Sequence, residues 1–343
     1  MKIRKKWVVI VKVNISIIGG GNGQSNLLRG LKKYDVDLTA IVTMADDGGG
    51  SGVLRTETGM LPPGDIRNCI VALSEAEPAM EVLMQHRFKE GRLKDQSFGN
   101  LFLAALNEIH GDFEIAISKI CEILAVKGRV LPVTLDDVRL EALLENGDKA
   151  EGECNISKVC IEKNTKIKEI SLIPKNVKPF NEVLEQIEKS QIIIMGPGSL
   201  YTSIIPNILT QGIAKCISET SSPKIYVANI MSEHGETDGM NIVDHVKAIY
   251  KHSAQDILNY VIVNKEKIPA SILKRYKEQG QQPLYIDETQ KNELNTLGIK
   301  VIESDLVKIK NGYIIHDSDK IAATIFNIED IFTTKIYKIS KNK

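Results

Sequence analysis

Short apolar runs along the chain end at loops that are rich in glycine. Residues 13–18 and 37–44 alternate or cluster β-branched residues, and residues 191–195 are almost wholly apolar, which predicts three strands. Between the first two runs, residues 24–33 place leucines at 27, 28 and 31, on one face of a helix. A strand, a glycine turn and a helix in this order are the first unit of a nucleotide-binding α/β fold.

The remaining patterns extend this fold along the chain. Helical spacing covers residues 66–74, 77–91, 100–126 and 183–189, and further short strands are predicted at 130–135, 138–143, 167–173, 224–230, 258–263 and 300–303. The fold class predicted is α/β: a Rossmann-like, mostly parallel sheet flanked by helices, with a β-rich insertion at 128–174. No linker or repeat divides the chain, so we expect a single domain over 13–330, preceded by an N-terminal extension, residues 1–12.

Three loops within about fifty residues are rich in Gly and Asp, which a plain scaffold does not need. They are Gly19–Gly23, Asp46–Gly52 and Pro62–Asn68. Glycines allow a sharp turn and a close approach to phosphate, and the free N–H groups of a new helix favour negative charge. Gln24 stands where the dinucleotide fingerprint has its third Gly or Ala, and there is no Gly-Lys-Ser/Thr, which excludes a Walker-type loop.

Acidic and basic side chains follow these turns. Asp46 and Asp47 come directly after the second predicted strand, where open α/β sheets bind ligands, and suit a metal or sugar-diphosphate loop. A surface Asp-Gly turn is the alternative. Asp65 is a candidate helix cap or a group that accepts from a substrate hydroxyl or holds Mg²⁺, while Arg67 offers a planar fork for phosphate oxygens.

A second strand-to-glycine junction occurs at Gly196–Ser203 and is dense in hydroxyl groups, which suit another part of the ligand. Farther on, His234, Glu236, Asp238 and His245 suggest a metal site. Their spacing matches no standard zinc motif, and caps and turns around neighbouring glycines explain most of them better.

Composition restricts the function classes. The 343 residues contain 44 Lys+Arg and 44 Asp+Glu, so the formal net charge is zero, which argues against a nucleic-acid binder. The five cysteines form no C-x-x-C pair, which predicts neither a zinc site nor a disulfide framework. The apolar run after the basic N-terminus is interrupted by Lys12, Asn14 and Ser16 and lacks a cleavage site, so we expect a cytoplasmic protein without a membrane span.

Six motifs together resemble one family. They are Gly-Gly-Gly-Asn-Gly at 19–23, Ala-Asp-Asp-Gly-Gly-Gly-Ser-Gly at 45–52, Pro-Pro-Gly-Asp-Ile-Arg-Asn at 62–68, Ser-Phe-Gly-Asn at 97–100, Gly-Pro-Gly-Ser-Leu-Tyr-Thr-Ser at 196–203 and Gly-Glu-Thr-Asp-Gly at 235–239. In this order, over about residues 13–325, they resemble the YvcK-like gluconeogenesis factors within the superfamily of 2-phospho-L-lactate transferase (CofD). The chain departs from the usual pattern at Asn22, where the family has Thr, and at Gly50, where it has Ser.

The resemblance implies a UDP-sugar-binding regulatory protein, with UDP-N-acetylglucosamine as the ligand. Such proteins serve cell morphogenesis and wall precursor supply under gluconeogenic growth, and glucosamine-6-phosphate synthase is the partner enzyme implied. The motif positions imply a nucleotide side of Gly20, Gly21, Asn22, Gly23, Gln24, Arg67, Asn68, Gly198, Ser199 and Tyr201. They imply a metal or acceptor side of Asp46, Asp47 and Asp65, with Mg²⁺ the metal to consider; no catalytic residue is assigned.

Two functions from different classes stay open. One is a binding protein that senses a UDP-sugar and signals to a partner; the other is a transferase that moves a phospholactyl group from a nucleotide carrier to a deazaflavin precursor, with acids holding Mg²⁺. The aromatic content of 5% disfavours a flavin-like acceptor, so the binding protein is preferred. A nicotinamide dehydrogenase fits poorly because of Gln24 and the lack of a catalytic pair. A homodimer is expected from base rates alone.

Overall fold

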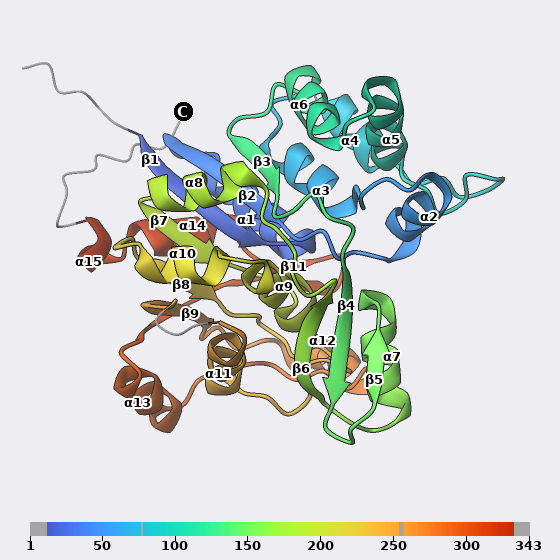
Figure 1. The fold of residues 1–343 in the computed structure, drawn as a ribbon. Helices are drawn as coiled ribbons and strands as arrows, with labels where there is room; N and C mark the ends of the chain where they lie inside the picture. The colour runs from blue at the N-terminus through green and yellow to red at the C-terminus, as the bar shows by residue number, and fades with distance from the viewer. Residues whose placement is uncertain (1–11, 77, 254–256, 333–343) are drawn as a thin grey trace, which may run out of the picture.

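A seven-stranded parallel sheet forms the centre of the computed structural model, which describes residues 12–76, 78–253 and 257–332 (Figure 1). The strand order is β10-β9-β8-β7-β1-β2-β3, and each neighbouring pair is parallel. The bounds are β1 Val13–Gly19, β2 Val36–Val42, β3 Arg129–Pro132, β7 Ile192–Met195, β8 Lys224–Val227, β9 Tyr260–Asn264 and β10 Lys300–Ser304. The predicted α/β class with a mostly parallel sheet is confirmed.

Two groups of helices pack on the sheet (Figure 1). On one side α1 (Gly21–Leu31) packs between α3 (Gly64–Leu73) and α14 (Ser318–Phe326). Because parallel strands are joined by right-handed crossovers, the helices that follow β7 and β8 lie on the opposite face. They include the π-helical turn η1 (Leu200–Ile204), α9 (Ile205–Leu209), α10 (Ile213–Glu219) and α11 (Ile242–His252), with α8 (Asn181–Lys189) packed on α10.

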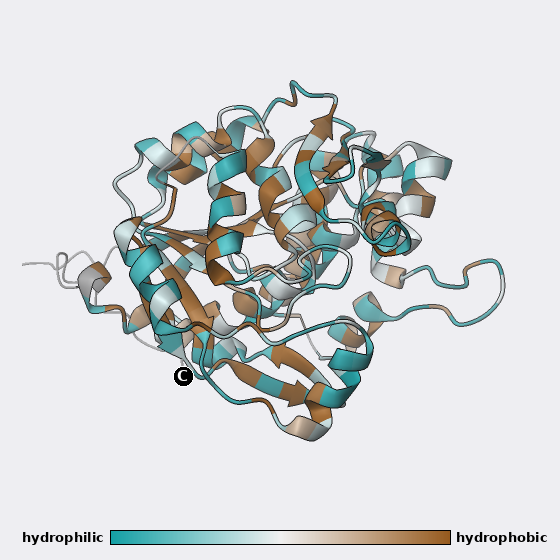
Figure 2. Cartoon of the chain, turned by 90° about the horizontal axis from the view of Figure 1, so that it is seen from below, coloured by the Kyte–Doolittle hydropathy of each residue, from teal (hydrophilic) through white to brown (hydrophobic). Residues whose placement is uncertain are grey.

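The strands supply the centre of the hydrophobic core. Figure 2 shows the central strands as mostly apolar, while the helices show polar faces outward. Ile15, Ile17, Ile194 and Val261 are all completely buried. A strand buried on both faces needs apolar residues at consecutive positions, which is why residues 191–195 lack a polar alternation.

The insertion differs from the prediction in two ways. β3, expected within it, instead pairs with β2 and forms the edge of the main sheet. The insertion proper is a three-stranded antiparallel sheet of β4 (Arg139–Leu144), β5 (Lys149–Glu151) and β6 (Ile167–Ile173), with helix α7 (Glu153–Glu162) between the last two strands. The sequence interpretation missed α7, whose apolar positions Ile156 and Cys160 give only a short buried stripe.

The predicted helix over 100–126 is two helices, α5 (Phe98–His110) and α6 (Phe113–Ile123). Gly111 adopts a left-handed conformation that ends α5, and Asp112 caps α6 by accepting from the N–H of Ile115. Ser97 caps α5 by accepting from the N–H of Asn100 (3.2 Å). The remaining helices described in this half are α2 (Gly49–Thr58) and α4 (Pro78–Gln85), the latter shorter than the predicted 77–91.

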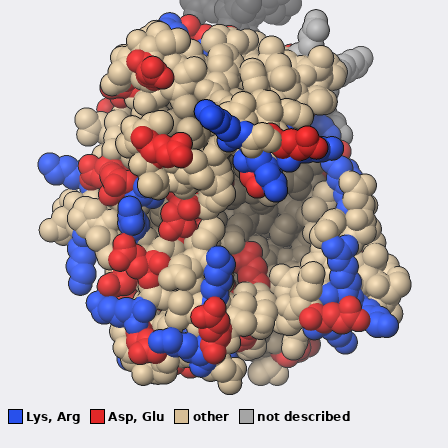
Figure 3. Space-filling view, turned by 90° about the vertical axis from the view of Figure 1, so that its right-hand side faces the viewer, with Lys and Arg blue, Asp and Glu red and all other residues tan. Residues whose placement is uncertain are grey.

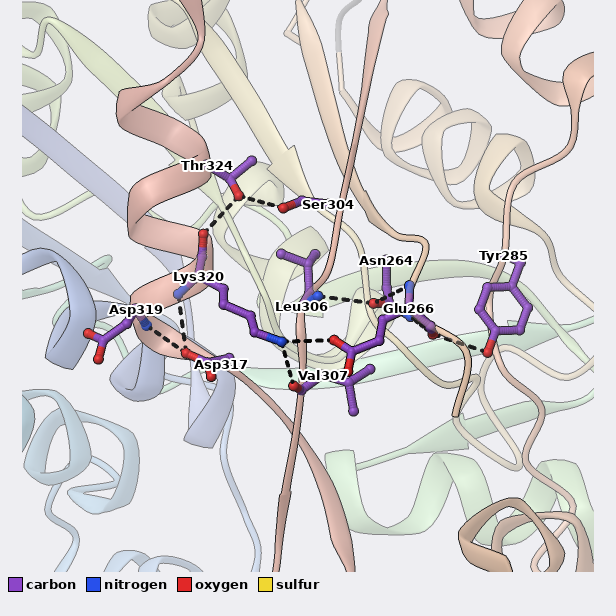
Figure 4. Close-up of polar contacts among 10 residues, drawn as sticks. All are labelled: Asn264, Glu266, Tyr285, Ser304, Leu306, Val307, Asp317, Asp319, Lys320 and Thr324. Atoms are coloured by element: carbon purple, nitrogen blue, oxygen red, sulfur yellow. Dashed lines mark hydrogen bonds and ion pairs between the residues drawn. The ribbon is translucent and has the colours of Figure 1, made fainter. Parts of the chain in front are cut away.

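A C-terminal hairpin, β11 (Val307–Lys310) and β12 (Tyr313–His316), was not predicted. Figure 4 shows how it is held: the N–H of Leu306 donates to Asn264 Oδ1 (3.1 Å), and Lys320 Nζ donates to Glu266 Oε2 (2.9 Å) and to the Val307 carbonyl (3.4 Å). These contacts tie the hairpin to the loop after β9. The same part of the chain contains α12 (Ala270–Glu278), α13 (Glu288–Thr296) and α15 (Glu329–Phe332).

The N-terminal extension predicted for residues 1–12 falls outside the described residues except for Lys12. The expectation of one domain over 13–330 stays a prediction. None of the described helices combines the length and the apolar character needed to cross a membrane.

Candidate functional site

A large cleft opens where the strand order reverses, between β1 and β7. The chain leaves β1 toward β2 on one side and β7 toward β8 on the other, so the loops after these strands diverge and leave a cleft. The cleft has a volume of about 820 Å³. Figure 3 shows a deep hollow with both acidic and basic side chains around its edge.

The glycine loop after β1 forms one wall of the cleft. Gly20, at the N-cap of α1, provides no side-chain cap, and the N–H of Gly21 donates to Asp65, so the other N–H groups of the first turn remain available to a ligand. A Cβ on Gly23 would lie 2.3 Å from the carbonyl oxygen of Pro197, in the loop after β7. The absence of a side chain at Gly23 therefore lets the two strand-to-helix junctions meet at the switch point.

Ten of the thirteen residues proposed for the site line this cleft. They are Gly20, Gly21, Asn22, Gly23, Asp46, Asp65, Arg67, Asn68, Gly198 and Ser199. The structure places the other three, Gln24, Asp47 and Tyr201, elsewhere. Residues separated by as many as 179 positions, such as Gly20 and Ser199, thus face one space.

Gln24 is buried beneath the glycine loop. Its Nε2 donates to the carbonyl of Ile17 in β1 (2.8 Å) and to that of Ile41 in β2 (3.0 Å). This bridge between two strands explains a glutamine where a dinucleotide-binding loop has Gly or Ala. Tyr201 is also buried, with its hydroxyl near the sulfur of Met240 (3.9 Å).

Asp47 supports the cleft from outside. Its Oδ1 accepts from the backbone N–H of Cys154 (3.0 Å), in the first turn of α7. That contact docks the insertion helix against the loop after β2. Glu153, the first residue of α7, lines the cleft as a result.

Three carboxyl groups lie near one another: the charge of Asp46 acts on Asp65, and the charges of both act on Glu153. Burial and the charge of Asp46 raise the pKa of Asp65 to about 7, although the Gly21 N–H, which donates to it, opposes the shift. Burial also raises the pKa of Asp46, against hydrogen bonds from Gly48 and Ser51. Burial and the charges of both aspartates raise the pKa of Glu153 well above its ordinary value. The predicted capping role of Asp65 is not seen, since Pro63 is the N-cap residue of α3.

Arg67 provides a buried positive charge. Its side chain is 8% exposed, its Nη2 donates to Asn68 Oδ1 (2.7 Å), and its buried Nε has no partner among the described residues. A Cβ on Gly99 would lie 2.6 Å from Arg67 Cδ, so the Ser-Phe-Gly-Asn segment makes room for this side chain. Burial lowers the pKa of Arg67, and the charge of Arg87 adds to that effect.

A second acidic pair lies on the β8 side. Ser199 Oγ donates to Glu233 Oε1 (3.0 Å), while Glu233 Oε2 and Glu236 Oε2 are buried without a partner. Burial and the charge of Glu233 raise the pKa of Glu236 to about 8. Burial likewise raises the pKa of Glu233, against its hydrogen bond from Ser199. Buried oxygens without donors are suited to the hydroxyl groups of a polar ligand.

The sequence interpretation missed several lining residues, because they lie outside the six motifs. Arg29 lies at the end of α1, and Lys310 and His316 come from the missed hairpin. The other missed lining residues include Arg87, Glu153, Asn229 and Glu233. The one local sequence feature that pointed to Glu153 was its position directly after Gly152, where an acidic residue can begin a helix.

The metal cluster considered around residue 240 does not assemble. His234 pairs with Asp238 (3.0 Å), whereas the buried His245 Nδ1 lies 2.9 Å from the hydroxyl of Tyr226. Burial lowers the pKa of His245 to about 4, which favours the neutral ring. Within the described residues, no three His, Cys, Asp or Glu side chains gather closely enough to hold a metal by themselves.

Comparison with known proteins agrees with this architecture. The family model described as 2-phospho-L-lactate transferase CofD matches residues 15–307. A protein of Thermoanaerobacterium thermosulfurigenes is 52% identical over 94% of this chain and 99% of its own length. The Bacillus subtilis protein named gluconeogenesis factor is 42% identical over 92% of this chain and 98% of its own.

Solved structures give the same relationship. A crystal structure of a member of the UPF0052 family from Bacillus halodurans superposes with a TM-score of 0.87, at 41% identity. The match covers 92% of this chain and the whole of that one. This chain therefore belongs to the CofD family and, within it, to the YvcK-like gluconeogenesis factors.

Proposed function

We propose that this protein is a cytoplasmic regulator that binds a UDP-sugar, with UDP-N-acetylglucosamine as the ligand. In this proposal it serves wall precursor supply and cell morphogenesis during growth on gluconeogenic carbon sources. The observation that carries the proposal is the cleft between β1 and β7, where one space collects donors for a diphosphate and acceptors for sugar hydroxyls.

The diphosphate side of the proposal uses α1 and α3. The uncapped start of α1 presents backbone N–H groups, and Arg67 adds the positive charge of a guanidinium group that lines the cleft. Helix N-termini favour anions, and a guanidinium fork matches phosphate oxygens, so the two would grip a diphosphate from two sides. Asn22 and Asn68 add amide groups on the same wall.

The sugar side uses the carboxyl groups. Carboxyl oxygens accept hydrogen bonds from hydroxyl groups, and Glu153 Oε2 and Glu233 Oε2 have no donor among the described residues. A sugar carrying several hydroxyls would supply those donors. Signalling to glucosamine-6-phosphate synthase and formation of a homodimer are part of the same proposal, and both need a surface outside this cleft.

Mg²⁺ is compatible with the carboxyl oxygens that line the cleft. This ion is commonly held by one or two carboxylates together with substrate phosphates and water. Asp46 and Asp65, the first of which raises the pKa of the second, are the residues that would hold it. A bound ion would supply positive charge beside the diphosphate.

A transferase that moves a phospholactyl group is the second candidate. It is favoured by the match to the CofD family and by the paired Asp46 and Asp65. The cleft lining within the described residues contains no Phe, Tyr or Trp, which leaves a deazaflavin-type acceptor without an aromatic stacking surface. The regulatory binding protein is therefore preferred.

Calorimetric titration tests the proposal. UDP-N-acetylglucosamine, UDP-glucose, GDP and NAD are titrated into the protein, each with and without Mg²⁺, and the nucleotide is recovered and analysed afterwards. We expect selective UDP-sugar binding, at least tenfold weaker in Arg67→Ala, with the ligand recovered intact. Arg139→Ala, an exposed arginine of the insertion, is the matched control.

Two outcomes would redirect the assignment. Tight, Mg²⁺-dependent GDP binding that is lost in Asp46→Asn would favour the transferase and call for an assay with the deazaflavin acceptor. If none of the four nucleotides binds, the proposed function is contradicted.

A further inference from the structure

A smaller pocket of about 260 Å³ adjoins the main cleft behind Arg67. It lies between the N-termini of α2 and α3 and the start of α5. Gly48, Gly49, Gly50, Ser51, Gly64 and Asn100 line it without lining the main cleft. Asp46, Asp65, Arg67, Asn68 and Arg87 line both spaces and form the partition between them.

Several polar groups around this pocket, both donors and an acceptor, have no partner among the described residues. Gly48, the N-cap residue of α2, gives no side-chain cap, so the N–H groups of the first turn of this ten-residue helix stay available. Arg67 is 8% exposed, and its Nε is unpartnered. Asn100 is 2% exposed, and its Oδ1 has no donor among the described residues. Buried polar groups are almost always paired, so these point to something that pairs with them.

The two arginines strengthen this argument. The charge of Arg87 acts on Arg67 and lowers its pKa, which means that two guanidinium groups face the same region. Like charges gathered beside a helix N-terminus are stabilised by an anion between them.

The two aspartates on the partition are already directed toward other donors. Asp46 Oδ1 accepts from the N–H of Gly48 (2.8 Å), and Ser51 also hydrogen-bonds to its carboxylate. Asp65 accepts from the N–H of Gly21, on the main-cleft side. The donors left over in the small pocket are therefore the Nε of Arg67 and the first turn of α2, with the charge of Arg87 beside them.

We propose that this small pocket, here named the anion pocket, is a second ligand site that binds a phosphoryl group while the nucleotide-sugar occupies the main cleft. A volume several times that of one water, about 30 Å³, accommodates a phosphate with a short carbon substituent. The ligand is free phosphate or the phosphoryl end of a small metabolite. The proposal does not depend on which nucleotide the main cleft binds.

Calorimetry in phosphate-free buffer tests the second site directly. Inorganic phosphate, glycerol 3-phosphate and acetate are titrated separately into the protein, and each titration is repeated after saturation with UDP. We expect one phosphate site per chain, retained in the presence of UDP, with acetate binding more weakly. Tighter binding of glycerol 3-phosphate than of phosphate would identify a metabolite as the ligand, and the reverse would identify free phosphate.

Two variants locate the site. Asn100→Asp places a negative charge in the anion pocket, and Arg87→Gln removes an exposed positive charge without disturbing the core. Each is expected to weaken phosphate binding about tenfold or more, because charge-assisted hydrogen bonds are lost or opposed. Asn107→Asp, the same change on α5 at a position that lines neither space, is the matched control. Thermal melts without phosphate show that each variant is folded.

The outcomes separate this proposal from the proposed function. The second site is overturned if phosphate does not bind, or if both variants bind it as tightly as wild type. It is also overturned if UDP abolishes phosphate binding, or if acetate binds as tightly as phosphate. If the protein binds a UDP-sugar but not phosphate, the proposed function stands and the second site does not. If it binds phosphate, loses that binding in both variants and does not bind a UDP-sugar, the second site stands and the proposed function does not.

Discussion

Asp47 Oδ1 accepts a hydrogen bond from the backbone N–H of Cys154 (3.0 Å), across 107 positions of sequence. This contact joins the loop after β2 to the first turn of α7 and holds Glu153 at the cleft. A residue proposed as a ligand for metal or acceptor thus supports the site from behind. Asp47 does not line the cleft, and its hydrogen bond joins the insertion to the loop after β2.

Replacing Asp47 by alanine is expected to reduce both stability and UDP-sugar affinity. Loss of a capping carboxylate costs about 0.5–2 kcal/mol, and α7 would then shift Glu153 away from the ligand. Urea denaturation measures the first effect and calorimetry the second. Asp112→Ala removes a comparable cap from α6, far from the cleft, and should lower stability alone. Equal affinities for the two variants would contradict a role of Asp47 in positioning Glu153.

Replacing Gly23 by alanine is expected to separate the two glycine junctions. The new Cβ would lie 2.3 Å from the carbonyl oxygen of Pro197, so α1 or the loop after β7 must move. Such overpacking costs about 1–3 kcal/mol, and the displaced helix N-terminus should lose UDP-sugar binding. Gly19→Ala is the control, because its Cβ would meet its nearest neighbour at 3.6 Å, an ordinary contact. Thermal melts that show equal stability for both variants would contradict this account.

Asp65 is expected to make the protein less stable as pH rises. Its pKa rises from 3.8 in the unfolded chain to about 7 in the fold, so between these values the folded state binds a proton that the unfolded state lacks. Stability from this group is therefore greatest below about pH 4, and it falls by at most about 1.4 kcal/mol per pH unit until about pH 7.

Urea denaturation from pH 4 to 8 checks the role of Asp65. Asp65→Asn should remove part of the decline, whereas Asp305→Asn, at an exposed position, should leave it unchanged. The other buried acids, Asp46 and Glu153, contribute in the same direction, so the difference between wild type and variant is the quantity to compare. Parallel curves for wild type and Asp65→Asn would show that Asp65 stays ionised.

Gln24→Ala is expected to act on stability rather than on the ligand. It removes the donor to the Ile17 and Ile41 carbonyls, which are buried between β1 and β2, and leaving such groups unpaired costs about 1–3 kcal/mol. Gln279→Ala, at an exposed position after α12, should change the unfolding free energy by less than about 0.5 kcal/mol. A Gln24→Ala protein as stable as wild type would show that the strand bridge is dispensable.

Local sequence patterns determined most of the framework. The apolar runs at 13–18 and 191–195 became β1 and β7, because a strand covered on both faces needs consecutive apolar residues. The glycine loops after them met at the switch point, since parallel strands end at the same edge of the sheet. Ten proposed site residues consequently line one cleft.

Only the tertiary structure decided the contributions that depend on packing between distant segments. β3 pairs with β2, which lies about ninety positions earlier in the chain. No local sequence pattern encodes a pairing between segments so far apart. The placement of Glu153 and of the β11–β12 hairpin depends on long-range contacts, such as those of Asp47 and Lys320. Strand and helix signals act over a few residues through backbone geometry, whereas burial and charge at a cleft depend on which segments the folded chain brings together.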